Sequence, residues 1–202
     1  MRLALAVVAA LGLCTGAVTL TACSSDNDKG GAAAPPPCVP DANEPNELPP
    51  TATSLGELND DDDPGPGGAT ASTRIDKTFS TSSETDVDWY LVEVNDTGIG
   101  GNPAIRVMVS GGSHEVTAYF TCTQGTTKAV ACGLGTAVTD DPDSKGAKGC
   151  KSTAPGSGAP PQLTMTIECD GTSTDSGRLQ IYVQRTAGVE ACVSYRLIVS
   201  VE

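Results

Sequence analysis

Apolar and polar residues alternate with a period of two along most of the chain after residue 75. In such a run one set of side chains is buried and the other faces water, which is the pattern of a half-buried β-strand. No stretch of ten or more residues after residue 23 has the 3.6-residue period of an amphipathic helix. The alternating runs lie at residues 90–94, 105–110, 116–122, 163–169, 179–184 and 194–201.

Turn-forming residues separate these runs. Examples are Asn95-Asp96-Thr97-Gly98 and Ser110-Gly111-Gly112-Ser113. Glycine accepts positive φ, and Asn and Asp bond their own backbone, so such segments interrupt strands. Seven to eight short strands separated by such turns predict an all-β fold, an antiparallel β-sandwich of jelly-roll-like type.

The N-terminal segment has the anatomy of an export signal. Arg2 precedes an apolar run from Leu3 to Leu13, and small and polar residues follow. The segment ends in Leu20-Thr21-Ala22-Cys23, which resembles the lipobox cut by the bacterial lipoprotein signal peptidase. Two alternatives stay open at this point: an uncleaved membrane anchor, and secretory cleavage after Ala22 without a lipid.

The lipobox resemblance implies a signal peptide over residues 1–22 and a lipid on Cys23. A lipoprotein of this kind would carry three acyl chains, palmitate among them, and two or more chains anchor a protein stably to a membrane. Ser24 after the cysteine favours the outer membrane in a Gram-negative bacterium, with the domain at the periplasmic or the external face. Residues 23–37 lack apolar periodicity and end in three prolines, which predicts a flexible tether ahead of a domain over residues 38–202.

Six cysteines remain once Cys14 leaves with the signal peptide and Cys23 takes the lipid. An even number in an oxidising compartment predicts three disulfides that staple the sandwich. The sequence does not choose among the fifteen possible pairings; our working prediction is Cys122–Cys132, Cys150–Cys169 and Cys38–Cys192. A zinc site is the alternative, but CxxC-like spacing is absent and the sole histidine, His114, is far in sequence from any cysteine pair.

Three short motifs occur in an order that suggests a family. Glu44-Pro45-Asn46-Glu47 comes first, Asp86-Val87-Asp88-Trp89-Tyr90 follows, and Tyr195-Arg196-Leu197-Ile198-Val199 lies near the end. This order resembles the bacterial pre-peptidase C-terminal domain over about residues 41–202. The resemblance implies a β-sandwich that serves as an accessory binding module rather than a catalyst.

The same resemblance implies a calcium site. Collagen-binding relatives of that family bind calcium through the first motif and an acidic loop, so the implied ligands are Glu44, Asn46, Glu47, Asp86 and Asp88. Glu47, Ala42 and Thr85 depart from the usual pattern of those relatives. Several oxygen ligands on irregular backbone do suit a hard cation. The alternative is structural, with Pro45 and Asn46 shaping a turn and the two aspartates capping loop amides.

No catalytic motif is present in the sequence. Ser113, His114 and Glu115 are adjacent, so their side chains would not converge as a triad does, and a histidine in a turn is the better interpretation. Trp89 is interpreted as a core or rim residue rather than a ligand platform. We therefore expect no enzyme and no required cofactor.

The chain has 25 acidic and 12 basic residues and a formal net charge of −13, which disfavours nucleic acid as a partner. We predict a lipid-anchored, non-catalytic binding module of the cell envelope, with a polysaccharide or protein partner and with the membrane contacted through Cys23. The alternatives are a structural or assembly subunit of an envelope complex, and an inhibitor or chaperone of a secreted hydrolase.

Overall fold

The structure is a computed structural model, and it describes residues 42–60, 73–83, 85–96, 102–139, 146–152, 159–171, 174–187 and 192–201. The predicted signal peptide, the tether, Cys23 and Cys38 lie outside these residues. Within them a 3-10 turn, η1 (Pro49–Thr51), precedes the strands. The strands are β1 (Thr53–Asn59), β2 (Arg74–Thr81), β3 (Val87–Asn95), β4 (Ala104–Ser110), β5 (His114–Cys122), β6 (Thr126–Leu134), β7 (Thr136–Val138), β8 (Lys148–Lys151), β9 (Gln162–Asp170), β10 (Gly177–Arg185) and β11 (Val193–Val201).

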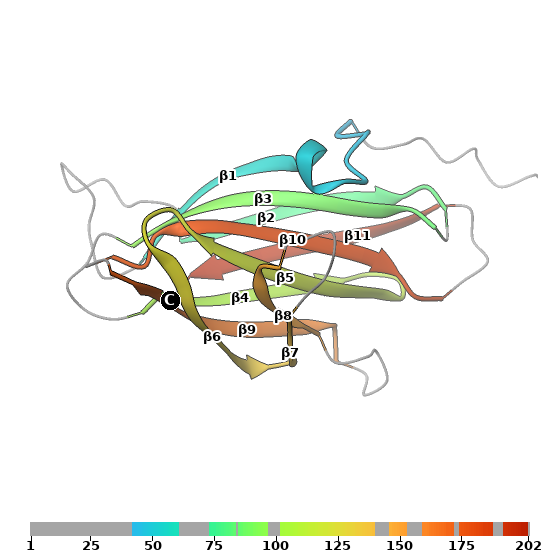
Figure 1. Cartoon of the computed structure of the whole chain (residues 1–202). Helices are drawn as coiled ribbons and strands as arrows, with labels where there is room; N and C mark the ends of the chain where they lie inside the picture. The colour runs from blue at the N-terminus through green and yellow to red at the C-terminus, as the bar shows by residue number, and fades with distance from the viewer. Residues whose placement is uncertain are drawn as a thin grey trace, which may run out of the picture. The chain divides into compact units, whose positions relative to one another are not determined.

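The strands form two sheets, which confirms the predicted all-β sandwich (Figure 1). The six-stranded sheet has the order β1-β3-β10-β5-β8-β7, and the five-stranded sheet has the order β2-β11-β4-β9-β6. Neighbouring strands are antiparallel except for β1, which runs parallel to β3.

Four nested strand pairs give the sandwich its jelly-roll topology. β2 pairs with β11, β3 with β10, β4 with β9 and β5 with β8. Successive pairs alternate between the two sheets, as they do when one long hairpin is rolled up. This topology brings residues near 88 and residues near 195 to facing sheets.

The described residues form eleven strands, where the alternating pattern predicts seven to eight. The additional strands are mostly polar and lie at or next to sheet edges. Leu58 is the one buried residue of β1, and the described residues of β6 and β7 are all at least partly exposed. An edge strand has fewer neighbours to cover it, so it needs no continuous apolar face. β8 is short, and Gly149 in it lies so close to the Ala118 carbonyl that a Cβ would come within 2.2 Å of the oxygen.

The core lies between the sheets and is built from alternate residues of the inner strands. Tyr90, Val92 and Val94 of β3 belong to the same core cluster as Leu197 and Val199 of β11 in the second sheet, and these five residues are 0–1% exposed. These are the apolar positions that the period-two pattern marks as buried.

Two disulfides link the sheets, and their pairing differs from the working prediction. Cys122 of β5 is bonded to Cys169 of β9, and Cys132 of β6 is bonded to Cys150 of β8, with Cα–Cα distances of 5.9 and 5.8 Å. The predicted pairs Cys122–Cys132 and Cys150–Cys169 are therefore wrong. β6 leaves β5 to pair with β9 in the other sheet, so cysteines that are close in sequence are carried to different partners. Cys192 is also disulfide-bonded; its predicted partner Cys38 lies outside the described residues.

Candidate functional site

The three family-like motifs meet in one buried hydrogen-bonded chain. Asn46 precedes β1, Asp88 lies on the core side of β3, and Tyr195 lies on β11 of the opposite sheet. The Tyr195 hydroxyl donates to Asp88 Oδ2 over 2.5 Å. With its amide nitrogen turned toward the carboxylates, Asn46 donates to Asp88 Oδ1 and to Glu44 Oε2, both over 3.1 Å. Residues more than one hundred positions apart are thus joined through one carboxylate.

Burial makes this chain of hydrogen bonds energetically important. Asn46 and Asp88 are 0% exposed and Tyr195 is 1% exposed. A buried carboxylate is tolerated only where hydrogen bonds replace its hydration. The pKa of Tyr195 is raised, first by burial and then by the neighbouring Tyr90 and Asp88, so its hydroxyl remains a proton donor. Tyr90 extends the chain, with its hydroxyl 2.5 Å from that of Tyr195.

Backbone contacts fix the segment before β1 to the start of β3. The Trp89 amide donates to the Asn46 carbonyl over 2.8 Å. The Asn46 amide donates to Glu44 Oε2 over 3.3 Å, and the Thr53 hydroxyl donates to the Asn43 carbonyl over 3.3 Å. The first motif is therefore held on the sandwich at the same place as the second.

Three of the five implied calcium ligands form a carboxylate cluster at this junction. Glu44, Glu47 and Asp86 each place an oxygen within 4.8 Å of the others. Glu47 is exposed, Glu44 is half-buried and Asp86 is 7% exposed. The other two, Asn46 and Asp88, belong to the buried hydrogen-bonded chain next to the cluster. Oxygen donors grouped in this way suit a hard divalent cation, which would also offset the repulsion among three carboxylates.

Asp86 of the second motif also serves the turn that carries it. Asp86 Oδ2 accepts a hydrogen bond from the Ser82 amide, four residues earlier. This contact is the loop capping of the structural alternative. The same side chain is thus used both to shape the loop and to complete the cluster.

His114, the sole histidine, begins β5 directly after the Gly111-Gly112-Ser113 turn. Its Nδ1 lies 2.8 Å from the Gly111 carbonyl, its Nε2 lies 3.3 Å from the Thr81 hydroxyl, and its ring packs on Tyr195. The side chain is 0% exposed. Burial, and to a smaller degree the charge of Arg185, lowers the pKa of His114 against the opposing effect of the Gly111 carbonyl. The ring thus fastens a turn to the core.

Trp89 is buried on the opposite side of β3 from the main core. Its ring is 2% exposed and packs on Tyr182 of β10 and Tyr119 of β5, with ring centroids 5.0 and 6.2 Å apart. Sequence reasoning missed this aromatic group, because the three residues meet only once β3, β10 and β5 are neighbours. With Trp89 so covered, the ring serves as a packing residue.

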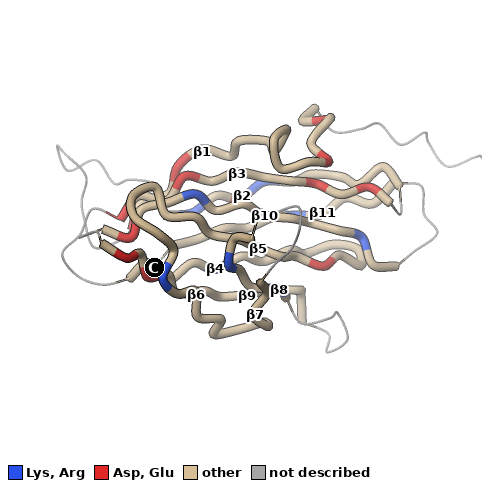
Figure 2. The backbone as a smooth tube through the Cα atoms, in the orientation of Figure 1, with Lys and Arg blue, Asp and Glu red and all other residues tan. Residues whose placement is uncertain are grey.

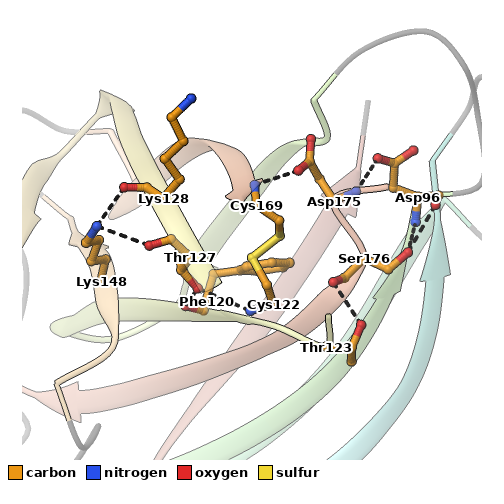
Figure 3. Close-up of a disulfide and its surroundings, with 10 residues drawn as sticks. All are labelled: Asp96, Phe120, Cys122, Thr123, Thr127, Lys128, Lys148, Cys169, Asp175 and Ser176. Carbon is orange, nitrogen blue, oxygen red and sulfur yellow. Dashed lines mark hydrogen bonds between the residues drawn. A yellow bond between two sulfur atoms is a disulfide. The ribbon is translucent and has the colours of Figure 1, made fainter. Parts of the chain in front are cut away.

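A hollow of about 480 Å³ lies beside the Cys122–Cys169 disulfide, where β8 and the β5–β6 connection approach each other. Phe120, Thr127, Lys148 and Gln180 contribute to its wall. Lys148 Nζ donates to the carbonyls of Thr127 and Lys128 over 3.1 and 2.6 Å (Figure 3). The ammonium group of Lys148 is thus bonded to backbone carbonyls, and the hollow does not point to a particular class of ligand.

Comparison with known proteins gives no family. No family model matches the chain, and no curated protein matches it. Among solved structures, it is similar to Aeromonas hydrophila PliG, a periplasmic inhibitor of g-type lysozyme, at 13% identity and a TM-score of 0.34, over 74% of this chain and 100% of that one. It is also similar to CorA, a surface-associated copper-binding protein of Methylomicrobium album BG8, at 12% identity and a TM-score of 0.35, over 75% and 99%. At these TM-scores neither likeness bears on function.

Among the residues that the structure describes, no helix has the length and apolar character needed to span a membrane.

Proposed function

We propose that this protein is a lipid-anchored, non-catalytic binding module of the cell envelope, with a polysaccharide or protein partner. The observation that carries the proposal is the structural use of the polar groups that an enzyme would need. His114 is enclosed by Thr81, Gly111 and Tyr195, and Asp88 holds Tyr195 and Asn46. General acid–base chemistry needs such groups within reach of a substrate.

The anchoring part of the proposal rests on Leu20-Thr21-Ala22-Cys23. Three acyl chains on Cys23 would place the sandwich at a membrane surface, and Ser24 favours the outer membrane. A tether over residues 23–37 would let the domain reach partners beyond that surface.

Kinship with the pre-peptidase C-terminal domain is part of the same proposal. It is supported by the order of the three motifs and by the hydrogen bonds among Asn46, Asp88 and Tyr195, one residue from each motif. The cluster of Glu44, Glu47 and Asp86 supports a calcium site at the junction of the first two motifs.

A fractionation experiment tests the anchor. Cys23→Ala should move the full chain from the membrane fraction to the soluble fraction and abolish labelling by a palmitate analogue. Cys14→Ala is the matched control, because it removes a cysteine of the same segment and should change neither readout. Retention of the Cys23→Ala chain in the membrane would contradict lipidation and favour an uncleaved anchor. A soluble, unlabelled wild-type chain would favour ordinary secretory cleavage.

A further inference from the structure

The outer surface formed by β2, β11 and β4 of the five-stranded sheet has more basic than acidic side chains, although the chain as a whole is acidic. Ile75, Val107 and Leu197 face the core, so the alternate residues of β2, β4 and β11 point outward. The outward positions include Arg74, Arg106 and Arg196 around Met108 and Ile198, and we call this surface the arginine face.

Strand register sets the spacing of the three arginines. Ser200 of the central strand β11 is paired with Arg74 on one side and with Arg106 on the other. These two arginines are therefore two strands apart, roughly 9.6 Å between backbones. Arg196 lies four residues along β11 from Ser200, or roughly 13 Å. Three cations are thus spread over three neighbouring strands rather than gathered at a point.

The arginine face has a positive excess. Asp76 is bonded to Arg196 through two atoms, over 2.6 Å each, and to Arg74 over 3.3 Å. The Arg196 guanidinium above all holds the pKa of Asp76 low, so this carboxylate stays ionised and orients both arginines. Arg106 donates to the neutral Gln162 over 2.7 Å. One carboxylate thus accompanies three guanidinium groups.

The outer face of the six-stranded sheet differs in its balance of charge. On the six-stranded sheet Arg178 is paired with Glu93 and Lys151 with Glu115, one cation to one anion. Many of the remaining acidic residues lie at strand ends and connections (Figure 2). The basic excess is therefore a property of the arginine face.

Hydroxyl side chains lie beside the arginines, and the outward positions of β2, β4 and β11 hold no aromatic residue. A ligand of this surface would therefore be held by charge and hydrogen bonds rather than by stacking on aromatic rings. Thr78, Ser110 and Ser200 offer hydroxyl groups next to the arginines. Guanidinium groups bind carboxylates, and hydroxyl groups match the hydroxyl groups of sugars.

The acidic remainder of the chain selects against densely charged polymers. A net charge of −13 repels a polyanion such as nucleic acid, which has one charge per about 1.7 Å of duplex. A polymer with widely spaced carboxylates meets the arginines at short range, while repulsion beyond about 8 Å is screened at physiological salt.

From this surface we infer that the arginine face binds an acidic polysaccharide that carries carboxylates on alternate sugars. This inference names the partner of the binding module and rests on the function proposed above. It predicts weak, salt-sensitive binding along the β2-β11-β4 surface, at a place distinct from the carboxylate cluster of Glu44, Glu47 and Asp86.

Binding of the full chain, purified in detergent, to hyaluronan tests the inference by titration calorimetry. Arg196→Gln and Arg106→Gln should each weaken binding by about ten- to a hundredfold, the loss expected for one charged hydrogen bond. Arg178→Gln is the matched control: Arg178 is 61% exposed and Arg196 is 55% exposed, and both donate through Nε to a cross-strand carboxylate. The control variant should bind as the wild type does.

Three outcomes would overturn the inference: no binding to hyaluronan at low salt, equal losses in the control and test variants, or binding to dextran or polyphosphate that equals binding to hyaluronan. Circular dichroism of each variant separates lost binding from lost folding. Because binding is measured in detergent solution, its failure is distinguishable from failure of the anchor, which Cys23→Ala fractionation reports.

Discussion

At the scale of single residues, the contact between Tyr195 and Asp88 joins the two sheets through a carboxylate. Both residues are buried, and the hydroxyl donates directly to Oδ2. Removing one partner leaves the other buried without its hydrogen bond, which costs more than the net value of the bond itself. The stability of the sandwich therefore depends in part on a polar contact buried between the two sheets.

Tyr195→Phe should lower the free energy of unfolding by about 1–3 kcal/mol, because Asp88 stays buried after the hydroxyl is gone. Urea unfolding of the full chain in detergent measures the change. Tyr182→Phe is the control, since Tyr182 is half-buried on the outer face of the six-stranded sheet. A Tyr195→Phe variant as stable as the wild type would show that water or a neighbour satisfies Asp88.

His114 makes stability depend on pH. Its pKa in the folded state lies below the ordinary value of 6.5, so the unfolded chain binds more protons just below that pH. The contribution of His114 to stability is full above about pH 6.5 and decreases as pH falls toward the folded pKa, by up to about 1.4 kcal/mol per pH unit. Among the described residues, Arg185 acts on the ring through its charge and the Tyr195 ring packs on it.

Unfolding curves between pH 5 and 7 measure this effect as the difference between the wild type and His114→Asn. The difference should shrink as pH falls, because the variant lacks the titrating ring. Carboxylates titrate in both proteins and cancel in the comparison. A difference independent of pH would mean that the ring is protonated equally in the folded and unfolded chains.

At the scale of elements, strands that bury an alternating apolar set were predictable, whereas edge strands and the short strand β8 were not. β3, β4, β5, β9, β10 and β11 each bury an alternating set of apolar residues, so their period is visible in the sequence. None of the described residues of β6 and β7 is fully buried, so neither strand needs an apolar face. Their sequences therefore lack the alternation of apolar and polar residues from which a strand can be predicted.

The disulfide pairing could not be predicted from the sequence either. The prediction joined cysteines that are close in sequence, as a β5–β6 hairpin within one sheet would do. β6 instead crosses to pair with β9, and this crossing places Cys122 opposite Cys169 and Cys132 opposite Cys150. Strand order in the sheets decides the pairing, and local sequence carries no signal for it.

For the candidate site, sequence order identified the motifs but not the way in which they meet. Glu44, Glu47 and Asp86 were named from the resemblance, and the structure places their oxygens together. The hydroxyl contact between Tyr90 and Tyr195 spans 105 positions and depends on the facing of two sheets. A contact between residues so far apart in the sequence cannot be predicted from any local pattern.

At the scale of the whole molecule, the carboxylate cluster links the segment that follows the predicted tether to the sandwich. The Trp89 amide donates to the Asn46 carbonyl, and Asn46 lies between Glu44 and Glu47 in the chain. A cation held by the cluster would tighten this junction, and Trp89, the sole tryptophan, lies beside it. A cation bound at this junction should therefore change the fluorescence of Trp89.

Calcium should raise the melting temperature of the full chain in detergent and change Trp89 fluorescence, and a chelator should reverse both effects. A ligand that binds only the folded state stabilises it by about 2.7 kcal/mol at one hundred times its dissociation constant. Glu47→Gln should abolish the calcium effect, because Glu47 supplies one of the three carboxylates of the cluster and is exposed. Glu57→Gln is the control, an exposed acid of β1 outside the cluster.

Without calcium, Glu47→Gln should be at least as stable as the wild type, since it removes one of three mutually repelling charges. A melting temperature that is the same with calcium and with chelator would instead leave Glu44, Glu47 and Asp86 as residues that shape two loops.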